Sequence, residues 1–122
     1  MWHVEFHEDF VPEFDAFAAR VQDAILARAI VLRELGPAAG RSGNTDSLKG
    51  SGFANMKELR VQVGGAPWRV AFAFDPLRRA IVLCAGNKRG KDQRRFYTEL
   101  IAVADKRFAR HLEDLERARH DP

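Results

Sequence analysis

Residues 56–74, MKELRVQVGGAPWRVAFAF, decide the fold class, because two runs of alternating side chains flank Gly64 and Gly65. Alternation of apolar and polar residues is typical of β-strands. Two adjacent glycines favour a two-residue turn, since both accept a positive φ angle. The stretch therefore predicts a β-hairpin with strands at 56–63 and 67–74.

The glycine turn also predicts the register of this hairpin. If Gly64 and Gly65 are the two loop residues, Arg60 lies directly opposite Arg69. Like charges that face each other across two strands destabilise a sheet. Either an anion binds between the two arginines, or a neighbouring acid neutralises them. Glu58, diagonal to Arg69, is the candidate acid, and both interpretations fit the sequence.

Side-chain parity places the two arginines on one face of the sheet. Val61 and Val70 share the other face with further bulky apolar residues, because successive strand residues point to opposite sides. We expect the helices to pack on that apolar face. Arg60 and Arg69 then lie on an open face, which the small Ala71 beside Arg69 keeps shallow.

Outward from the hairpin, periodicity and turn residues predict the remaining elements. They are strands at 2–6 and 79–85, helices from Pro12, at 20–35 and at 92–117, and a loop at 36–52. The last helix has an apolar stripe that includes Phe96, Leu100 and Val103, followed by Phe108 or Ala104. The order is β-α-α-β-β-β-α, which predicts an α+β fold with a mainly antiparallel sheet and helices on one face.

Length and composition bound the class of protein. With 122 residues and 46% hydrophobic residues, the chain is long enough for a single domain, 1–122, with one core. Its one cysteine, Cys84, excludes an intrachain disulfide and a cysteine metal cluster. We find no signal peptide and no membrane-spanning run. We therefore expect a cytoplasmic protein without a membrane, metal or cofactor requirement.

The positive charge is concentrated in the middle of the chain. Residues 49–95 contain eleven Lys and Arg against three Asp and Glu, whereas the flanking segments are acidic or nearly balanced. Such a cluster indicates a site for nucleic acid or another polyanion. A solvated surface that favours solubility is the simpler alternative.

The segment after the third central strand extends this basic cluster. Gly86 and Gly90 flank a basic loop that leads into a helix N-terminus, where backbone N–H groups add to the positive charge. The phosphate-binding loop pattern of nucleotide hydrolases is absent from the sequence. Tyr97, the only tyrosine, could stack on a base, donate a proton or pack beside Phe96.

These residue types suit RNA cleavage without a metal. The 2′-OH attacks the adjacent phosphate, and fixed cations stabilise the charge that builds up on phosphorus. A base must accept the 2′-OH proton and an acid must protonate the leaving oxygen. The candidate cations are Arg60, Arg69 and Lys88. The candidate bases are Asp46, Glu58 or a lysine of lowered pKa, and the candidate acids are Tyr97 or an Arg or Lys.

Several motifs in order resemble the RelE/HigB toxins, in the branch found in phages as Gp49-like proteins. The matching motifs are Leu48-Lys49-Gly50-Ser51, Met56-Lys57-Glu58-Leu59-Arg60, Trp68-Arg69-Val70-Ala71-Phe72-Ala73-Phe74-Asp75-Pro76, Gly86-Asn87-Lys88, Phe96-Tyr97 and, near the end, Phe108 with His111-Leu112. The resemblance covers nearly the whole chain. It implies the RelE-like α+β domain, with the same element order as predicted above.

The resemblance also implies an activity and partners. Relatives are toxins of type II toxin–antitoxin modules that enter the 30S A site and cleave mRNA, with the ribosome orienting the substrate. The partner would be a HigA-like helix-turn-helix antitoxin encoded nearby. The expected catalytic residues are Arg60, Arg69, Lys88, Tyr97 and Asp46. The expected RNA-binding residues are Lys49, Lys57, Arg89, Lys91, Arg94 and Arg95.

Two alternatives to this activity fit the same residues. A non-catalytic RNA-binding or regulatory module would bind RNA in a salt-dependent way and leave it intact. A structural protein would use the basic face to bind an acidic partner protein.

Overall fold

The computed structural model describes residues 1–121, with the side chain of Ser42 excepted. The elements, in chain order, are β1 (His3–Phe6), α1 (Val11–Asp15), α2 (Ala19–Leu35), the 3-10 helix η1 (Gly36–Ser42), β2 (Thr45–Ser47), β3 (Met56–Val63), β4 (Ala66–Phe74), β5 (Arg79–Asn87) and α3 (Gln93–His120). The α+β class and the order of the predicted elements are confirmed.

The strands form one mixed five-stranded sheet in the order β1-β5-β4-β3-β2. β1 runs parallel to β5, and the other three pairings are antiparallel. The prediction of a mainly antiparallel sheet is therefore confirmed. The parallel contact joins residues that are far apart in the sequence, since His3 pairs with Arg79.

The central hairpin has the register that its glycines predict. Val63 pairs with Ala66, and Arg60 lies opposite Arg69. Gly64 and Gly65 have φ angles of 56° and 80°, which non-glycine residues rarely adopt. A two-residue turn of this kind leaves no freedom for the strands to slip past each other.

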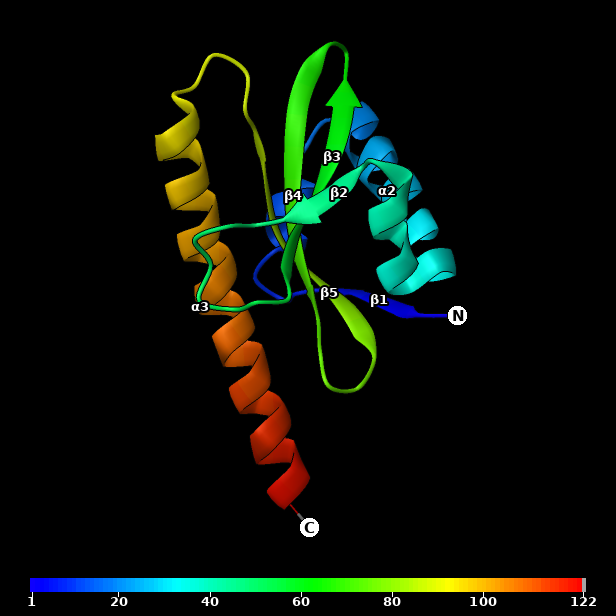
Figure 1. Cartoon of the computed structure of the whole chain (residues 1–122), viewed down its shortest axis with the longest axis vertical. Coiled ribbons are helices and arrows are strands. Elements are labelled where there is room, and N and C mark those ends of the chain that lie inside the picture. The colour runs from blue at the N-terminus through cyan, green and yellow to red at the C-terminus, as the bar shows by residue number, and fades with distance from the viewer. Residues whose placement is uncertain (122) are drawn as a thin grey trace.

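The prediction that the helices pack on one face of the sheet is wrong. α2 covers the bulky apolar face, where its Ile25 and Leu32 join a core that includes Phe72. α3 covers part of the opposite face and buries Ala71 and Ala73 completely. Figure 1 shows α2 and α3 on opposite sides of the sheet. The two alanines do not keep an open face shallow; their small side chains let α3 approach the strands closely.

The predicted loop at 36–52 contains two short elements, so that prediction is also wrong. η1 follows α2 directly, and β2 adds an edge strand to β3. β2 consists of Thr45, Asp46 and Ser47, and its two last residues are unfavourable in strands. It is held by cross-strand contacts, including the hydrogen bond from Lys57 Nζ to Ser47 Oγ at 3.1 Å.

α3 begins at the residue that the sequence predicts. The Asp92 side chain accepts a hydrogen bond from the Arg95 backbone N–H at 2.9 Å and caps the helix. Ala104 is fully buried, whereas Val103 is 40% exposed. The apolar stripe of α3 therefore includes both Ala104 and Phe108, and the prediction that Val103 belongs to it is wrong.

The surroundings of Cys84 decide whether its thiol could act as a nucleophile. Cys84 is buried in the core beneath α3, and burial raises the pKa of its thiol to about 12. It is thus a small core residue rather than a nucleophile.

Within residues 1–121, no helix has the length and apolar character that crossing a membrane requires.

Candidate active site

The two facing arginines differ in their surroundings. The Arg60 side chain is 44% exposed, whereas that of Arg69 is 11% exposed. Arg69 lies nearer to α3 and donates a hydrogen bond from Nη1 to the Trp68 carbonyl at 3.1 Å. Arg60 lies nearer to β2, at the margin that α3 leaves uncovered. The sheet therefore presents one fixed and one accessible guanidinium.

Glu58 lies between the two arginines and is almost completely buried. Its Oε1 accepts a hydrogen bond from Arg60 Nε at 3.3 Å and lies 4.0 Å from Arg69 Nε. Its Oε2 is buried and has no hydrogen-bond partner among the described residues. A buried carboxylate is costly unless cations and hydrogen bonds compensate it. Glu58 is thus the neutralising acid, with one oxygen left for a further donor.

Asp46 supplies a second carboxylate from the edge strand β2. It pairs with Glu58 in the β2–β3 register, and its Oδ2 accepts a hydrogen bond from Arg60 Nη2 at 3.1 Å. Its Oδ1 accepts the Ser47 backbone N–H at 2.8 Å. The Arg60 guanidinium is therefore held between two carboxylates.

Tyr97 brings the first turn of α3 into the same group. Arg69 Nε donates a hydrogen bond to Tyr97 Oη at 3.1 Å. Burial raises the pKa of the Tyr97 hydroxyl, and Glu58 raises it further, while the hydrogen bond from Arg69 partly opposes them. The hydroxyl is therefore protonated at neutral pH. Because its oxygen accepts from Arg69, its own proton can be donated to another oxygen.

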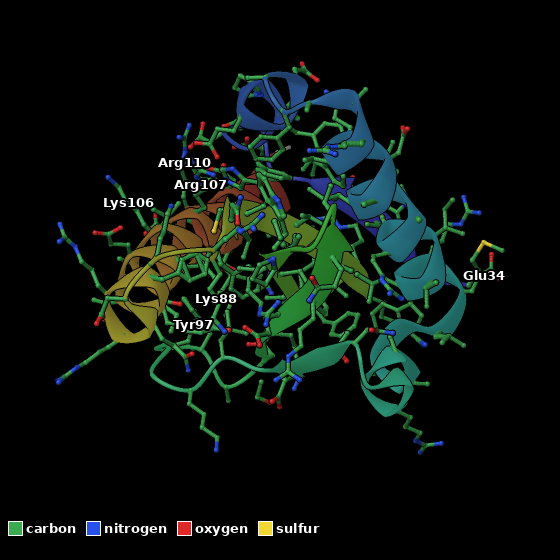
Figure 2. The ribbon with its side chains drawn as sticks, turned by 90° about the horizontal axis from the view of Figure 1, so that it is seen from above. Glu34, Lys88, Tyr97, Lys106, Arg107 and Arg110 are labelled. Atoms are coloured by element: carbon green, nitrogen blue, oxygen red, sulfur yellow. The ribbon has the colours of Figure 1, made fainter. Side chains whose placement is uncertain are left out.

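Lys88 follows β5 and lies over the ring of Tyr97. Its Nζ is 5.4 Å from the ring centroid, within the range of a cation–π interaction. Figure 2 shows the two labelled side chains close together beside the sheet. The Lys88 backbone N–H donates to the Pro67 carbonyl at 2.8 Å and fixes the start of the loop.

The structure thus brings together all five residues predicted to be catalytic. Contacts run from Asp46 through Arg60, Glu58, Arg69 and Tyr97 to Lys88. Glu58 is the member that the predicted set omitted, although its diagonal position beside Arg69 indicated it. Three cations and two carboxylates leave a formal charge of about +1 at this site.

The residues predicted to bind RNA separate into two groups. The first group is exposed near the site, in the loop after β2 and between the end of β5 and the first turn of α3. Its members are Lys49, Arg89, Lys91, Arg94 and Arg95. Two of these have internal contacts, since Lys91 Nζ lies 5.9 Å from the Phe96 ring and Arg95 Nε 3.3 Å from a Glu99 oxygen. Lys57 pairs with Phe72 on the α2 side of the sheet and is not brought to the site.

The loop that carries Lys49 is fastened to α3. Asp105 accepts hydrogen bonds from Ser51 Oγ at 2.5 Å and from the Gly52 backbone N–H at 2.8 Å. The Ser51 hydroxyl in turn accepts the Phe53 N–H at 3.0 Å. These contacts hold the β2–β3 connection against α3, one side of the candidate site. In residues 1–121, no group of three or more His, Cys, Asp and Glu side chains could hold a metal ion.

Comparisons with known proteins agree with one another. Residues 12–109 match the family described as Phage derived protein Gp49-like (DUF891). Two Mycobacterium tuberculosis (strain ATCC 25618 / H37Rv) proteins described as candidate toxins are similar to the chain. HigB2 is 45% identical over 95 residues, which cover 77% of this chain and 46% of HigB2. HigB3 is 44% identical over 94 residues, which cover 75% of this chain and 79% of HigB3. The chain therefore spans about half the length of the first relative.

A solved structure supports the fold. The Escherichia coli toxin RelE, an arginine-to-alanine double mutant in the free state, superimposes with a TM-score of 0.58 at 15% identity. The match covers 87% of this chain and 96% of that structure. The solved structure shows the fold, whereas the matched family and the sequence relatives show the family to which the chain belongs. The chain belongs to the RelE/HigB family of toxins, in its phage-derived Gp49-like branch.

Proposed function

We propose that this chain is the toxin of a type II toxin–antitoxin module and cleaves mRNA on the ribosome. The observation that carries the proposal is Glu58, a buried carboxylate whose Oε2 has no partner among the described residues. It lies within 4.0 Å of two arginines. A base beside fixed cations is the arrangement that attack of a 2′-OH on phosphate requires.

In the proposed reaction, Glu58 accepts the 2′-OH proton as the 2′-oxygen bonds to phosphorus. Arg60 and Arg69 stabilise the negative charge on the phosphoryl oxygens, and Tyr97 donates a hydrogen bond to one of them. The bond from phosphorus to the 5′-oxygen breaks, and the Lys88 ammonium protonates that oxygen. The products are a 2′,3′-cyclic phosphate and a 5′-hydroxyl, so protons and charge balance without a further reactant.

The ribosome supplies what this site lacks in the proposal. Arg60 is occupied by Asp46 and Glu58 in the free chain, so the RNA phosphate must compete with Asp46 for it. An mRNA held in the 30S A site would present its backbone at high effective concentration. The exposed basic residues Lys49, Arg89 and Arg94 would add salt-dependent contacts to phosphates.

The test is primer extension on ribosome-bound mRNA with Glu58→Gln and Lys88→Ala. We expect each to slow cleavage by about a hundredfold or more. The matched controls are Glu34→Gln and Lys106→Ala, whose side chains lie away from Lys88 and Tyr97 in Figure 2 and should leave cleavage unchanged.

Two outcomes would count against the proposal. Cleavage by Glu58→Gln at the parental rate would remove Glu58 as the base. Bound but intact mRNA in the presence of the parental protein would favour the non-catalytic RNA-binding module instead.

A further inference from the structure

The outer edge of β5 is only partly covered by β1. The parallel pairing ends where Phe6 meets Val82, but β5 continues to Asn87. Arg107 closes the edge at the next residue, since its Nη1 donates to the Leu83 carbonyl at 2.7 Å. Figure 2 shows Arg107 on α3 beside the sheet. The last four residues of β5 lie beyond this closure.

The antiparallel register determines which backbone groups face outward there. The Lys88 N–H donates to the Pro67 carbonyl of β4. Counting back by two residues, the backbone groups of Gly86 and Cys84 also face β4. In an antiparallel ladder, the residues between them direct their N–H and C=O groups to the other side. Ala85 and Asn87 therefore offer two donors and two acceptors along the edge. Within residues 1–121, these groups have no backbone hydrogen-bond partner.

A groove of about 340 Å³ follows this free edge. Phe17, in the connection between α1 and α2, lines one side, and Phe96, Leu100 and Val103 of α3 line the other. Val103 is 40% exposed although it is a large apolar residue. Unpaired backbone groups beside apolar pockets are the features that an added strand uses for affinity and specificity.

The charges of the groove distinguish it from the RNA site. Glu13 and Glu99 balance Arg107 and Lys91 in its lining. Glu13 also neutralises Arg107 directly, with an oxygen 2.6 Å from its Nη2. A formally neutral, apolar groove complements an uncharged apolar segment rather than a phosphate backbone.

We propose that the groove binds an extended, apolar segment of a partner protein, which adds a strand to β5 at residues 84–87. Residues 84–87 of this β5 edge include no Pro and no charged residue, the usual means by which proteins block such pairing. A strand bound here would end beside Lys88. It would be separated by β5 from Arg69, which pairs with Gly86 on the other side. The partner would therefore reach the candidate active site from its β5 side.

The test is amide hydrogen exchange of the full chain, alone and with the full-length helix-turn-helix protein encoded beside its gene. The choice of this partner rests on the proposed function. The amides of Ala85 and Asn87 should exchange rapidly in the free chain and about tenfold or more slowly in the complex. The amides of Cys84 and Gly86, which face β4, should be protected in both states and serve as internal controls.

A matched pair of variants tests the groove. Val103→Asp should weaken partner binding by about tenfold or more, because it places a charge in the apolar wall. Val11→Asp, at a similarly exposed valine of α1 outside the groove, should bind within about twofold of the parent.

Four results would overturn the proposal, and three of them would be seen in the exchange data. These are a complex in which Ala85 and Asn87 stay unprotected, the same protection produced by an RNA oligonucleotide, or a self-associated chain with protected edge amides. Absence of any complex with the helix-turn-helix protein would overturn it as well. Primer extension with the chain alone tests the proposed function separately, so the two failures are distinguishable.

Discussion

At the residue scale, the Tyr97 hydroxyl is the group whose role can be isolated most cleanly. Its removal leaves the ring, and with it the contacts to Phe96 and Lys88. Within the chain, the substitution removes the hydrogen bond from Arg69 and the interaction of the hydroxyl with Glu58. A phenylalanine at this position therefore separates the chemistry of the hydroxyl from the packing of the ring.

We expect Tyr97→Phe to reduce cleavage of ribosome-bound mRNA by about ten- to a hundredfold. The free energy of unfolding should fall by only about 1 kcal/mol, the value of one partly buried hydrogen bond. Single-turnover cleavage and urea denaturation measure the two effects. Thr98→Ala, at the next and exposed residue of α3, is the control, and an equal loss of cleavage there would contradict the assignment.

Glu58 is also the residue that allows Arg60 and Arg69 to face each other. The facing arginines are tolerable in the sheet because Glu58 is buried beside both of them. The sequence predicted the facing arginines from Gly64 and Gly65 and left open whether a bound anion or Glu58 neutralises them. It could not show that one carboxylate oxygen is left without a partner, because this depends on how closely α3 packs over the strand.

At the element scale, the fastening of the β2–β3 connection to α3 depends on Asp105. Both of its carboxylate oxygens accept hydrogen bonds from this connection. Without them, Lys49 and the following residues lose their attachment to the last helix. The loop would then no longer be fixed beside the candidate active site.

We expect Asp105→Ala to lower the free energy of unfolding by about 1.5–3 kcal/mol, the usual range for hydrogen bonds to a charged group. The Gly52 amide should exchange faster than in the parent. Asp114→Ala on the same helix, where the carboxylate pairs with the exposed Arg117, should change stability by less than about 0.5 kcal/mol. Equal effects of the two substitutions, measured by urea denaturation, would show that Asp105 is not a specific anchor.

Elements with strong periodic signals were predictable, and those held by tertiary contacts were not. The hairpin register follows from Gly64 and Gly65 alone. β2 escaped prediction because Asp46 and Ser47 are poor strand residues, and the strand exists through pairing with β3. The second helical layer escaped because Ala71 and Ala73 resemble a solvent-facing surface in the sequence. Only the packing of α3 identifies them as core.

At the scale of the whole molecule, Asp75 ties the turn between β4 and β5 to the C-terminal half of α3. Its Oδ2 lies 2.9 Å from His111 Nε2 and 2.9 Å from Arg79 Nε. Burial alone would raise the pKa of the Asp75 carboxyl, but hydrogen bonds from His111 and Arg79 lower it below its ordinary value of 3.8. The ionised carboxylate is therefore the form that stabilises the fold.

This lowered pKa predicts how stability changes with pH. Because the carboxyl binds its proton more weakly in the folded chain, its contribution is complete above the unfolded pKa, about 4. It is lost as the pH falls through the folded value. Urea denaturation should show this loss below about pH 4 in the parent and a weaker one in Asp75→Asn.

Asp75→Asn should also be less stable than the parent at neutral pH, since it leaves Arg79 without its buried counter-charge. Asp114→Asn, at a more exposed carboxylate, is the control and should keep the parental pH dependence. An Asp75→Asn protein with the parental slope in acid would assign the acid sensitivity to another group.

Because β1 pairs with β5, the first strand of the chain cannot find its partner until most of the chain has been synthesised. Residues 3–6 leave the ribosome long before residues 79–82, to which they pair. At elongation rates of about 5–20 residues per second, the first strand waits roughly 4–15 s for its neighbour. Lys88 and Tyr97 are made later still. A nascent chain therefore cannot complete the candidate site until most of the protein has been translated, which delays the onset of any toxicity to the ribosome that makes it.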